Sequence, residues 1–302
     1  MRTCVQSFSV ARLAFALFAF LLAASFGWAA DGIVDTIEKS FSVSARARLI
    51  VHNVDGQTRV TASAPSRIQV KAVKEVRGAS DSEEARAAAA RVEVRIEQVG
   101  DRVEVEARHP KDVSFLRRRP QVLVHFEVTA PVAADLEIHA VDGEVNAEGF
   151  EGHIDLSTVD GQLIAHKCSG QIKARAVDGN LTVDGSKGEI DAQTVDGALT
   201  LEGVWEAIDA RATDGSINIR ALPGSKMRSE WSIRSTDGGI QLRLPEGFAA
   251  DLDASSSDGD ISSNHPITVT GTTSKQRLSG KLNGGGYLLR IHSSDGSIHI
   301  LR

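Results

Sequence analysis

Cysteine is nearly absent from this sequence, which has two in its 302 residues, Cys4 and Cys168. Cys4 lies in an N-terminal segment that we expect to be removed, so the mature chain would keep a single thiol. This excludes an intramolecular disulfide and a paired-cysteine metal site. Aromatic residues are also scarce, at 5% of the chain. That scarcity suits thin repeats, which bury Ile, Val and Ala rather than large rings.

The chain also lacks the short motifs of common catalytic and metal sites. Its nine histidines are dispersed without a His-Glu-x-x-His match, and there is no Gly-x-Ser-x-Gly element or phosphate-binding loop. Calcium-binding β-rolls use Gly-Gly-x-Gly-x-Asp, whereas here Asp precedes Gly. We therefore expect no catalytic residue, no cofactor and no metal site, and no rise in melting temperature with calcium.

What the sequence does have is the dipeptide Asp-Gly at a fixed spacing. It recurs every 18 residues from Asp142 to Asp214. Self-similarity at a short period is typical of repeat proteins. Between the dipeptides, apolar residues alternate with polar ones, as in residues 154–157. Alternation with period two indicates β-strands with one buried face.

Each repeat divides into two nine-residue halves, marked by a weaker glycine spacing at Gly152, Gly170 and Gly188. Nine residues fit a strand of about five residues and a turn. Because 18 is even, successive repeats keep the same side chains inward. We therefore predict an all-β fold, a single-stranded parallel β-solenoid (β-helix) of roughly 18-residue coils.

The Asp-Gly pairs are predicted to form the corners of this coil. Glycine accepts positive φ, and the Asp side chain can accept hydrogen bonds from the backbone amides of the turn. The frame continues with insertions on both sides, which gives nine coils. The predicted structural turn residues are Asp55, Gly56, Asp142, Gly143, Asp160, Gly161, Asp178, Gly179, Asp196, Gly197, Asp214, Gly215, Asp237, Gly238, Asp258, Gly259, Asp295 and Gly296.

The N-terminus is typical of a secretory signal, predicted over residues 1–29. Arg2 and Arg12 precede an apolar run from Leu13 to Phe26, followed by small residues suited to cleavage. We expect no transmembrane segment after cleavage. Cleavage lowers Lys plus Arg from 34 to 32 and leaves Asp plus Glu at 40, so the net charge becomes −8. An acidic mature chain argues against nucleic acid or an anionic membrane as the partner.

The remaining chain is predicted to contain a linker at 30–40 and one β-solenoid domain at 41–302. Within the domain we expect irregular coils with insertions at 41–135, regular repeats at 136–220 and irregular coils at 221–302. A capping box that begins at Ser80 predicts one short surface helix near 81–91. Residues 264–288 are either a further coil or a hairpin. The last strand, which ends at Arg302, is expected to leave an open edge for end-to-end self-association.

A few side chains are candidates for ligand contact. Arg117, Arg118 and Arg119 form a basic run that could contact an anionic envelope polymer. Glycoside cleavage needs a pair of carboxylates, and the outward Asp155, Asp191 and Asp209 are available. Lys173 and Arg175 interrupt that column, which favours a solvated strand face. The rings available to line a sugar groove are Tyr287, Trp205 and Trp231.

The chain resembles the bacterial putative adhesin family, a secreted β-solenoid group of unknown function with Asp-Gly repeats. The residues that carry the resemblance are an early Val54-Asp55-Gly56 coil, a strand end at Ala130-Pro131, the segment 244–248 and the ending Ser294–Ile298. It covers about Phe41 to Arg302. It implies a β-solenoid in the cell envelope and brings no catalytic residues.

We therefore expect an exported, non-catalytic protein of the periplasm or cell surface, an adhesin-like scaffold that binds an envelope macromolecule, protein or polysaccharide. One alternative is a carbohydrate-active β-helix enzyme, which needs a carboxylate pair in an aromatic-lined groove. Another is an envelope-stress regulatory protein that binds a protein through its open end. Fold alone does not decide between them.

Overall fold

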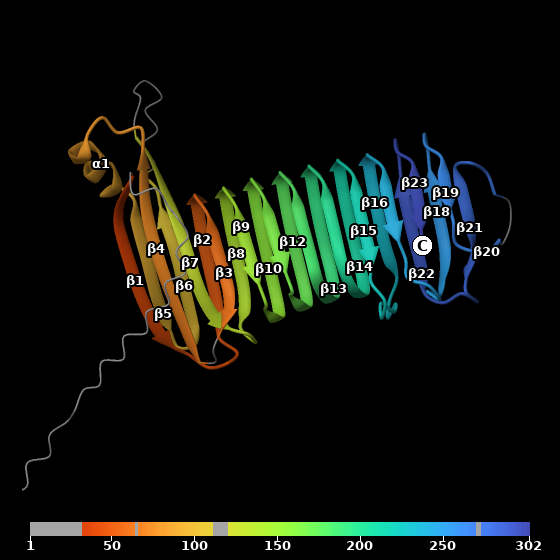
Figure 1. Cartoon of the computed structure of the whole chain (residues 1–302), viewed down its shortest axis with the longest axis horizontal. Coiled ribbons are helices and arrows are strands. Elements are labelled where there is room, and N and C mark those ends of the chain that lie inside the picture. Colours follow the sequence, from red (N-terminus) through yellow and green to blue (C-terminus); the bar gives the residue numbers. More distant parts are fainter. Residues whose placement is uncertain (1–31, 64–65, 111–119, 270–272) are drawn as a thin grey trace, which may run out of the picture. The chain divides into compact units, whose positions relative to one another are not determined.

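The computed structural model describes residues 32–63, 66–110, 120–269 and 273–302. Residues Gly32–Arg302 form one compact unit, whose strands lie side by side in a long row (Figure 1). Within the described residues there are 23 strands and one helix, so the prediction of an all-β chain with one short helix is confirmed. The predicted signal segment, residues 1–29, and Arg117–Arg119 lie outside the described residues.

The elements fall into three groups along the chain. The first group is β1 (Ile33–Ser42), β2 (Arg48–Asp55), β3 (Thr58–Ser63), β4 (Arg67–Arg77), α1 (Ser82–Ala89), β5 (Glu93–Val99), β6 (Arg102–Arg108) and β7 (Gln121–Pro131). The second is β8 (Asp135–Asp142), β9 (Val145–Glu148), β10 (Glu151–Asp160), β11 (Leu163–His166), β12 (Ser169–Asp178), β13 (Leu181–Asp196), β14 (Leu199–Asp214) and β15 (Ile217–Ala221). The third is β16 (Trp231–Asp237), β17 (Ile240–Arg243), β18 (Ala250–Ser256), β19 (Ile261–Ser263), β20 (Ile267–Val269), β21 (Arg277–Leu282), β22 (Leu288–Ser293) and β23 (Ile298–Leu301).

The central repeats pair in parallel, each with the repeat 18 residues away. Ile154 of β10 lies beside Ile172 of β12, and Leu163 of β11 lies beside Leu181 of β13. One ladder runs through β8, β10 and β12, and the other through β9 and β11. Within these ladders the register does not shift, so the alternating apolar side chains stay on the buried face.

The interior is narrow and consists mainly of Ile, Leu, Val and Ala, as the sequence pattern predicts. The two largest fully buried side chains are Trp205 and Trp231. Trp231 packs on Phe248, with ring centroids 5.0 Å apart. The expectation that each half-repeat holds a separate short strand is wrong for β13 and β14. Each of these strands has 16 residues, because pairing continues through the half-repeat corner by a shift in register near Gly188.

At the N-terminal end the pairing becomes antiparallel. β4 lies between β1 and β7, while β5 pairs with β6. β1 occupies most of the segment predicted to be a linker at 30–40, because its residues pair with β4. Among the described residues, no helix is long and apolar enough to cross a membrane.

The helix α1 begins one residue later than the predicted capping box. Asp81 is the N-cap, and its Oδ1 accepts hydrogen bonds from the backbone N–H groups of Glu83 and Glu84 at 2.9 and 2.8 Å. Glu84 in turn accepts from the N–H and the hydroxyl of Ser80. The carboxylate of Asp81 therefore takes the capping role that the pattern assigns to Ser80.

At the C-terminal end, the spatial order of the strands departs from the order of the chain. β22 lies between β16 and β18, and β23 lies between β17 and β19, with parallel pairing on both sides. β21 pairs antiparallel with β18 and β20, so residues 264–288 contribute an antiparallel strand pair rather than a further coil. The strand that ends near Arg302 is an inner strand, and the predicted open edge there is wrong.

Candidate binding surfaces

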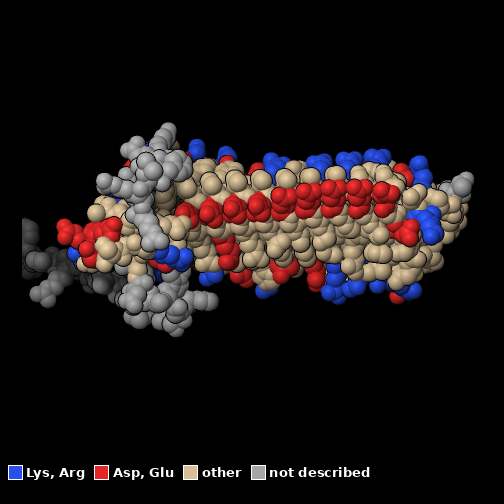
Figure 2. Space-filling model, turned by 90° about the horizontal axis from the view of Figure 1, so that it is seen from above, with Lys and Arg blue, Asp and Glu red and all other residues tan. Residues whose placement is uncertain are grey.

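The nine aspartates of the Asp-Gly turns come together in one straight row. Sheet register places Asp142 beside Asp160 and continues the row to Asp214 and Asp237. Asp55 extends the row at one end. Asp295 and then Asp258 extend it at the other, because β22 and β23 lie between the neighbouring repeats. Figure 2 shows the row as an unbroken acidic line along one edge of the stack. Adjacent strands are about 4.8 Å apart, so the side chains of the row follow one another closely.

The glycine after each aspartate lets successive turns approach this closely. A Cβ at Gly161 would lie 2.1 Å from the carbonyl oxygen of Gly143, and one at Gly197 would lie 2.2 Å from that of Gly179. Both glycines have positive φ, 123° and 133°. Positive φ, the predicted reason for glycine, holds at Gly56, Gly143, Gly161, Gly179, Gly197 and Gly215. At Gly238, Gly259 and Gly296 φ is not positive, and there only the close approach of a neighbouring turn's backbone excludes a side chain.

The aspartates do not take the role that turn chemistry predicts for them. In the described part of the chain, none of the nine accepts a hydrogen bond from a backbone amide, and none pairs with Lys or Arg within 4.0 Å. Asp55 accepts a hydrogen bond from Gln121 Nε2 at 2.9 Å. The row is thus a line of like charges that the turns do not require, which leaves the carboxylates available to a partner.

Crowding of the carboxylates changes their protonation. The pKa of Asp142 is raised by partial burial and by the charges of Asp55 and Asp160. The pKa of Asp237 is raised by desolvation and by Asp214 and Asp295 on either side. Each ionised neighbour disfavours a further negative charge.

A row of exposed valines lies directly beside the aspartates. Between 36% and 48% of the surface of each of these residues is exposed. They precede the first five aspartates of the row and are Val54, Val141, Val159, Val177 and Val195. We call these valines together with the nine aspartates the Val–Asp edge. Such a regular apolar row on a protein surface is typical of a contact site.

Replacing one carboxylate in the row should stabilise the fold. In Asp142→Asn we expect the free energy of unfolding at pH 7 and low salt to rise by about 0.5–1 kcal/mol, because repulsion from two neighbours is removed. A raised folded-state pKa means that the wild type gains stability as pH falls through that pKa, and the variant should lack this gain. Urea denaturation measures both effects. Asp260→Asn, outside the row, is the control, and a gain that persists in 1 M salt would contradict the explanation.

The outer face of β2, β8 and β10 carries a chain of polar side chains. Ser157 Oγ lies 2.6 Å from His139 Nδ1, and His139 Nε2 lies 3.0 Å from Glu137 Oε1. Arg48 pairs with Glu137 at 2.6 Å, and His52 stacks on His139 with ring centroids 5.2 Å apart. Arg48 and His139 lower the pKa of Glu137 to about 2.

This Ser–His–Glu order resembles that of hydrolases, but its surroundings do not support catalysis. β10 is hydrogen-bonded on both edges, to β8 on one side and to β12 on the other. The backbone N–H groups of β10 are therefore engaged in the sheet and do not form an oxyanion hole. Serine–histidine neighbours also recur at Ser262 and His299. These pairs follow from the sheet register, and we interpret the linked side chains of Ser157, His139 and Glu137 as a surface hydrogen-bond network.

The pairing of Glu137 makes the fold sensitive to acid. Because its folded-state pKa lies below the unfolded value, its stabilisation is complete above about pH 4.5 and is lost as pH falls to about 2. We expect Glu137→Gln to lower the free energy of unfolding at pH 7 by about 1–2 kcal/mol, allowing for the solvent exposure of Arg48. Its difference from wild type should vanish near pH 2, as measured by circular dichroism in urea. Glu38→Gln on β1 is the control, and a difference that stays constant with pH would contradict the assignment.

The residues expected for a carbohydrate-active site are not arranged as one. Asp155 lies 3.3 Å from Lys173, and Arg175 bridges Asp155 and Asp191 at 4.0 and 3.3 Å. Arg211 pairs with Asp209. These outward carboxylates are therefore neutralised by ion pairs, as the interrupted column predicts.

Two of the three candidate rings are also unavailable for a groove. Trp205 and Trp231 are fully buried, and Tyr287 is exposed. Among the described residues, no cluster of His, Cys, Asp and Glu suits a metal ion.

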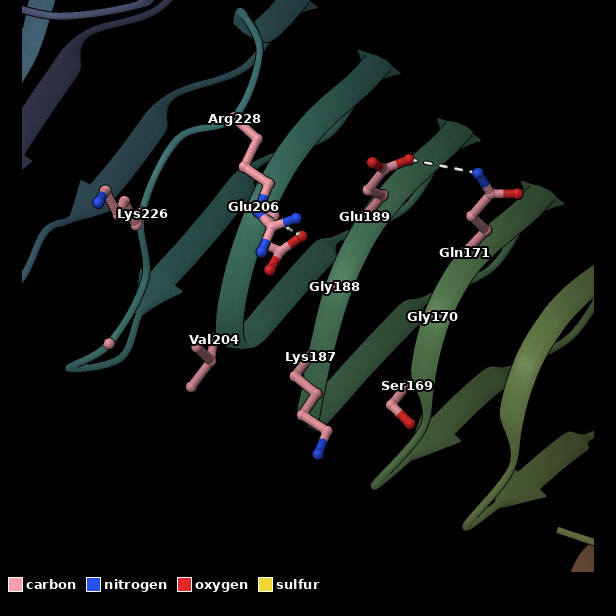
Figure 3. Close-up of a pocket in the computed structure, with 11 residues that line it drawn as sticks. Ser169, Gly170, Gln171, Lys187, Gly188, Glu189, Val204, Glu206, Lys226 and Arg228 are labelled. Carbon is pink, nitrogen blue, oxygen red and sulfur yellow. Dashed lines mark hydrogen bonds and ion pairs between the residues drawn. The ribbon is translucent and has the colours of Figure 1, made fainter. Parts of the chain in front are cut away.

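A hollow of about 650 Å³ lies at the other corner of the repeat, half a repeat from the aspartate row. Gly170 and Gly188 form its floor, and Lys187, Lys226 and Arg228 stand around it (Figure 3). The sequence analysis missed this site. Lys226 and Arg228 lie in an insertion, and only the folded chain brings them next to β13.

Comparisons with known proteins place these features in context. The model of the Toastrack DUF4097 family matches residues 44–221 and 193–301, a span that reaches from β2 to β23. No match is found among curated proteins.

The chain is also similar to several crystal structures. A putative adhesin from Parabacteroides merdae is 11% identical with a TM-score of 0.48, over 88% of this chain and 96% of that chain. One from Bacteroides fragilis is 10% identical with a TM-score of 0.46, over 88% and 97%. A protein described as a putative lipid binding protein, from Parabacteroides distasonis, is 10% identical with a TM-score of 0.34, over 90% and 98%.

Proposed function

The chain belongs to the Toastrack DUF4097 family, and from that premise we propose that it is an exported, non-catalytic binding scaffold of the cell envelope. Its stack of 18-residue repeats acts as a rigid parallel β-solenoid that presents the Val–Asp edge to an envelope macromolecule. The parallel register of β8 to β12 supports the solenoid architecture. The apolar run before Ala29 supports export.

The observation that carries this proposal is that none of the nine aspartates forms an ion pair within the described chain. Desolvation and neighbouring charges raise the pKa of Asp142 and Asp237, and no Lys or Arg of the described chain lies within 4.0 Å of a carboxylate in the row. The exposed valines beside the row add an apolar contact surface. Together these rows fit a partner that is cationic and partly apolar, and they disfavour nucleic acid and anionic lipid.

A test uses the mature protein and isolated envelope fragments, with co-sedimentation and new reducing ends measured in the same tubes. We expect retention without cleavage, and weaker retention as salt rises. The triple variant Asp160→Asn, Asp178→Asn and Asp196→Asn should lose most of the retention. Its control, Glu93→Gln with Glu97→Gln and Glu104→Gln, removes the same charge from β5 and β6.

The outcomes separate the alternatives. Release of reducing ends would favour the carbohydrate-active enzyme. Equal retention of the triple variant and its control would remove the Val–Asp edge from the proposal.

A further inference from the structure

The geometry of the hollow points to a second binding site, independent of the Val–Asp edge. We propose that the hollow bounded by β12, β13 and residues 222–228 binds an acidic oligosaccharide, a sugar chain that carries carboxylates. The hollow's volume, about 650 Å³, lies in the range of roughly 300–1,000 Å³ typical of ligand sites.

The floor of the hollow is backbone rather than side chain. A Cβ at Gly170 would lie 2.4 Å from the carbonyl oxygen of Gly152, and one at Gly188 would lie 2.3 Å from that of Gly170. Tight packing of successive repeats therefore keeps this row free of side chains. The result is a shallow track along the stack, a shape that suits an extended chain of sugar rings better than a compact ligand.

Cationic side chains surround the track. Within the described residues, neither Lys187 nor Lys226 has a carboxylate within 4.0 Å. Arg228 pairs with Glu206 at 3.1 Å, and 72% of its side chain is exposed, so guanidinium donors remain available. Figure 3 shows these residues spread around the glycine floor rather than converging on one point. Separated cations match carboxylates distributed along a polymer.

Acceptor groups in the same hollow select the kind of anion. Glu189 and Gln171 lie together on the wall, with Gln171 Nε2 3.4 Å from Glu189 Oε2. Sugar hydroxyls can donate to these oxygens and accept from the lysines, whereas a polyphosphate offers acceptors alone and cannot donate to Glu189 or Gln171. The mixture of donors and acceptors therefore favours a hydroxylated, carboxylated ligand.

The wall formed by residues 222–228 is held in place before any ligand arrives. Lys226 N–H donates to the Trp205 carbonyl at 3.1 Å, and Arg228 N–H donates to that of Glu206 at 2.9 Å. Ser225 Oγ accepts from Trp205 N–H at 3.0 Å. A wall fixed by backbone hydrogen bonds loses little conformational entropy on binding. The buried ring of Trp205 also lies behind this wall, which provides a fluorescent reporter.

The test is titration of the mature protein with an oligogalacturonate of defined length, followed by calorimetry and tryptophan fluorescence. A neutral maltooligosaccharide and inorganic polyphosphate of similar length are the comparison ligands. We expect binding of the oligogalacturonate alone. Lys187→Gln with Lys226→Gln should weaken it by ~10-fold or more, because two charge-assisted contacts are lost. Lys71→Gln with Lys275→Gln is the control of equal charge.

Several outcomes would overturn the proposal. These are no binding of oligogalacturonate, equal binding of polyphosphate, or equal weakening by the two lysine pairs. Asp160→Asn with Asp178→Asn and Asp196→Asn should leave oligogalacturonate binding intact. Failure of the Val–Asp edge and failure of the hollow are therefore distinguishable.

Discussion

Gly179→Ala is expected to destabilise the protein by about 4 kcal/mol or more, or to prevent folding. A Cβ at this position would lie 1.9 Å from the carbonyl oxygen of Gly161, and the φ of Gly179 is 136°. Relief would require the repeats of Gly161 and Gly179 to separate, which breaks the parallel pairing of β10 with β12 and of β11 with β13. Urea denaturation of the purified variant, or its loss from the soluble fraction, measures the effect.

Gly247→Ala separates backbone strain from steric overlap. Gly247 also has positive φ, 76°, but a Cβ there would meet nothing within 4 Å. We expect a loss of only about 1 kcal/mol, the cost of the left-handed conformation alone. Similar losses in the two variants would contradict the view that close stacking of the turns explains the repeated glycine.

Removal of residues 287–302 is expected to unfold much more than the segment removed. β22 and β23 each pair with strands on both sides, so among the described strands their loss leaves β19 without a partner and removes one partner each from β16, β17 and β18. Four fully buried side chains are lost with them, Leu289, Ile291, Ile298 and Ile300. Their burial contributes roughly 6–12 kcal/mol in total. Hydrogen exchange should show lost protection from β18 to β21 and weakened protection in β16 and β17, which keep β14 and β15 as partners, while β8 to β12 stay protected.

A synthetic peptide of residues 286–302 provides the positive control for this truncation. If the missing strands normally fill the slot between β17 and β19, added peptide should restore protection to both neighbours. Deletion of Arg302 alone should have little effect, because that residue pairs with Glu246 at the surface. Unchanged protection of β18 and β19 in the truncated protein would contradict the strand order in which β22 and β23 lie beside them.

Much of the fold could be predicted because the repeat is local and regular. The spacing of Asp-Gly and the alternation around Ile154 and Leu156 indicate strands, buried faces and register, since each depends on neighbouring residues. The same pattern does not show that all nine aspartates form one row. The pattern also led to the wrong prediction that the aspartate side chains accept hydrogen bonds from turn amides. An Asp-Gly turn has the same sequence whether or not its carboxylate makes such a bond.

The hollow and the C-terminal order could not be predicted in this way. Lys187 and Lys226 are 39 residues apart and meet only because residues 222–228 fold back against β14. The turn at Asp295 carries the same pattern as the turn at Asp258, so both fit the same frame. Which of them lies next to Asp237 depends on packing between whole strands.

The sequence by itself determined the all-β class, the 18-residue period, the buried face of each strand and the glycine corners. These follow from steric limits on the backbone and from burial of alternating apolar residues, which act over a few residues. Only the tertiary structure decided the order of the last strands, the position of α1 and β1 at the N-terminal end, and the cations around the hollow. Those features depend on contacts between segments far apart in the chain, where several arrangements satisfy the same local pattern.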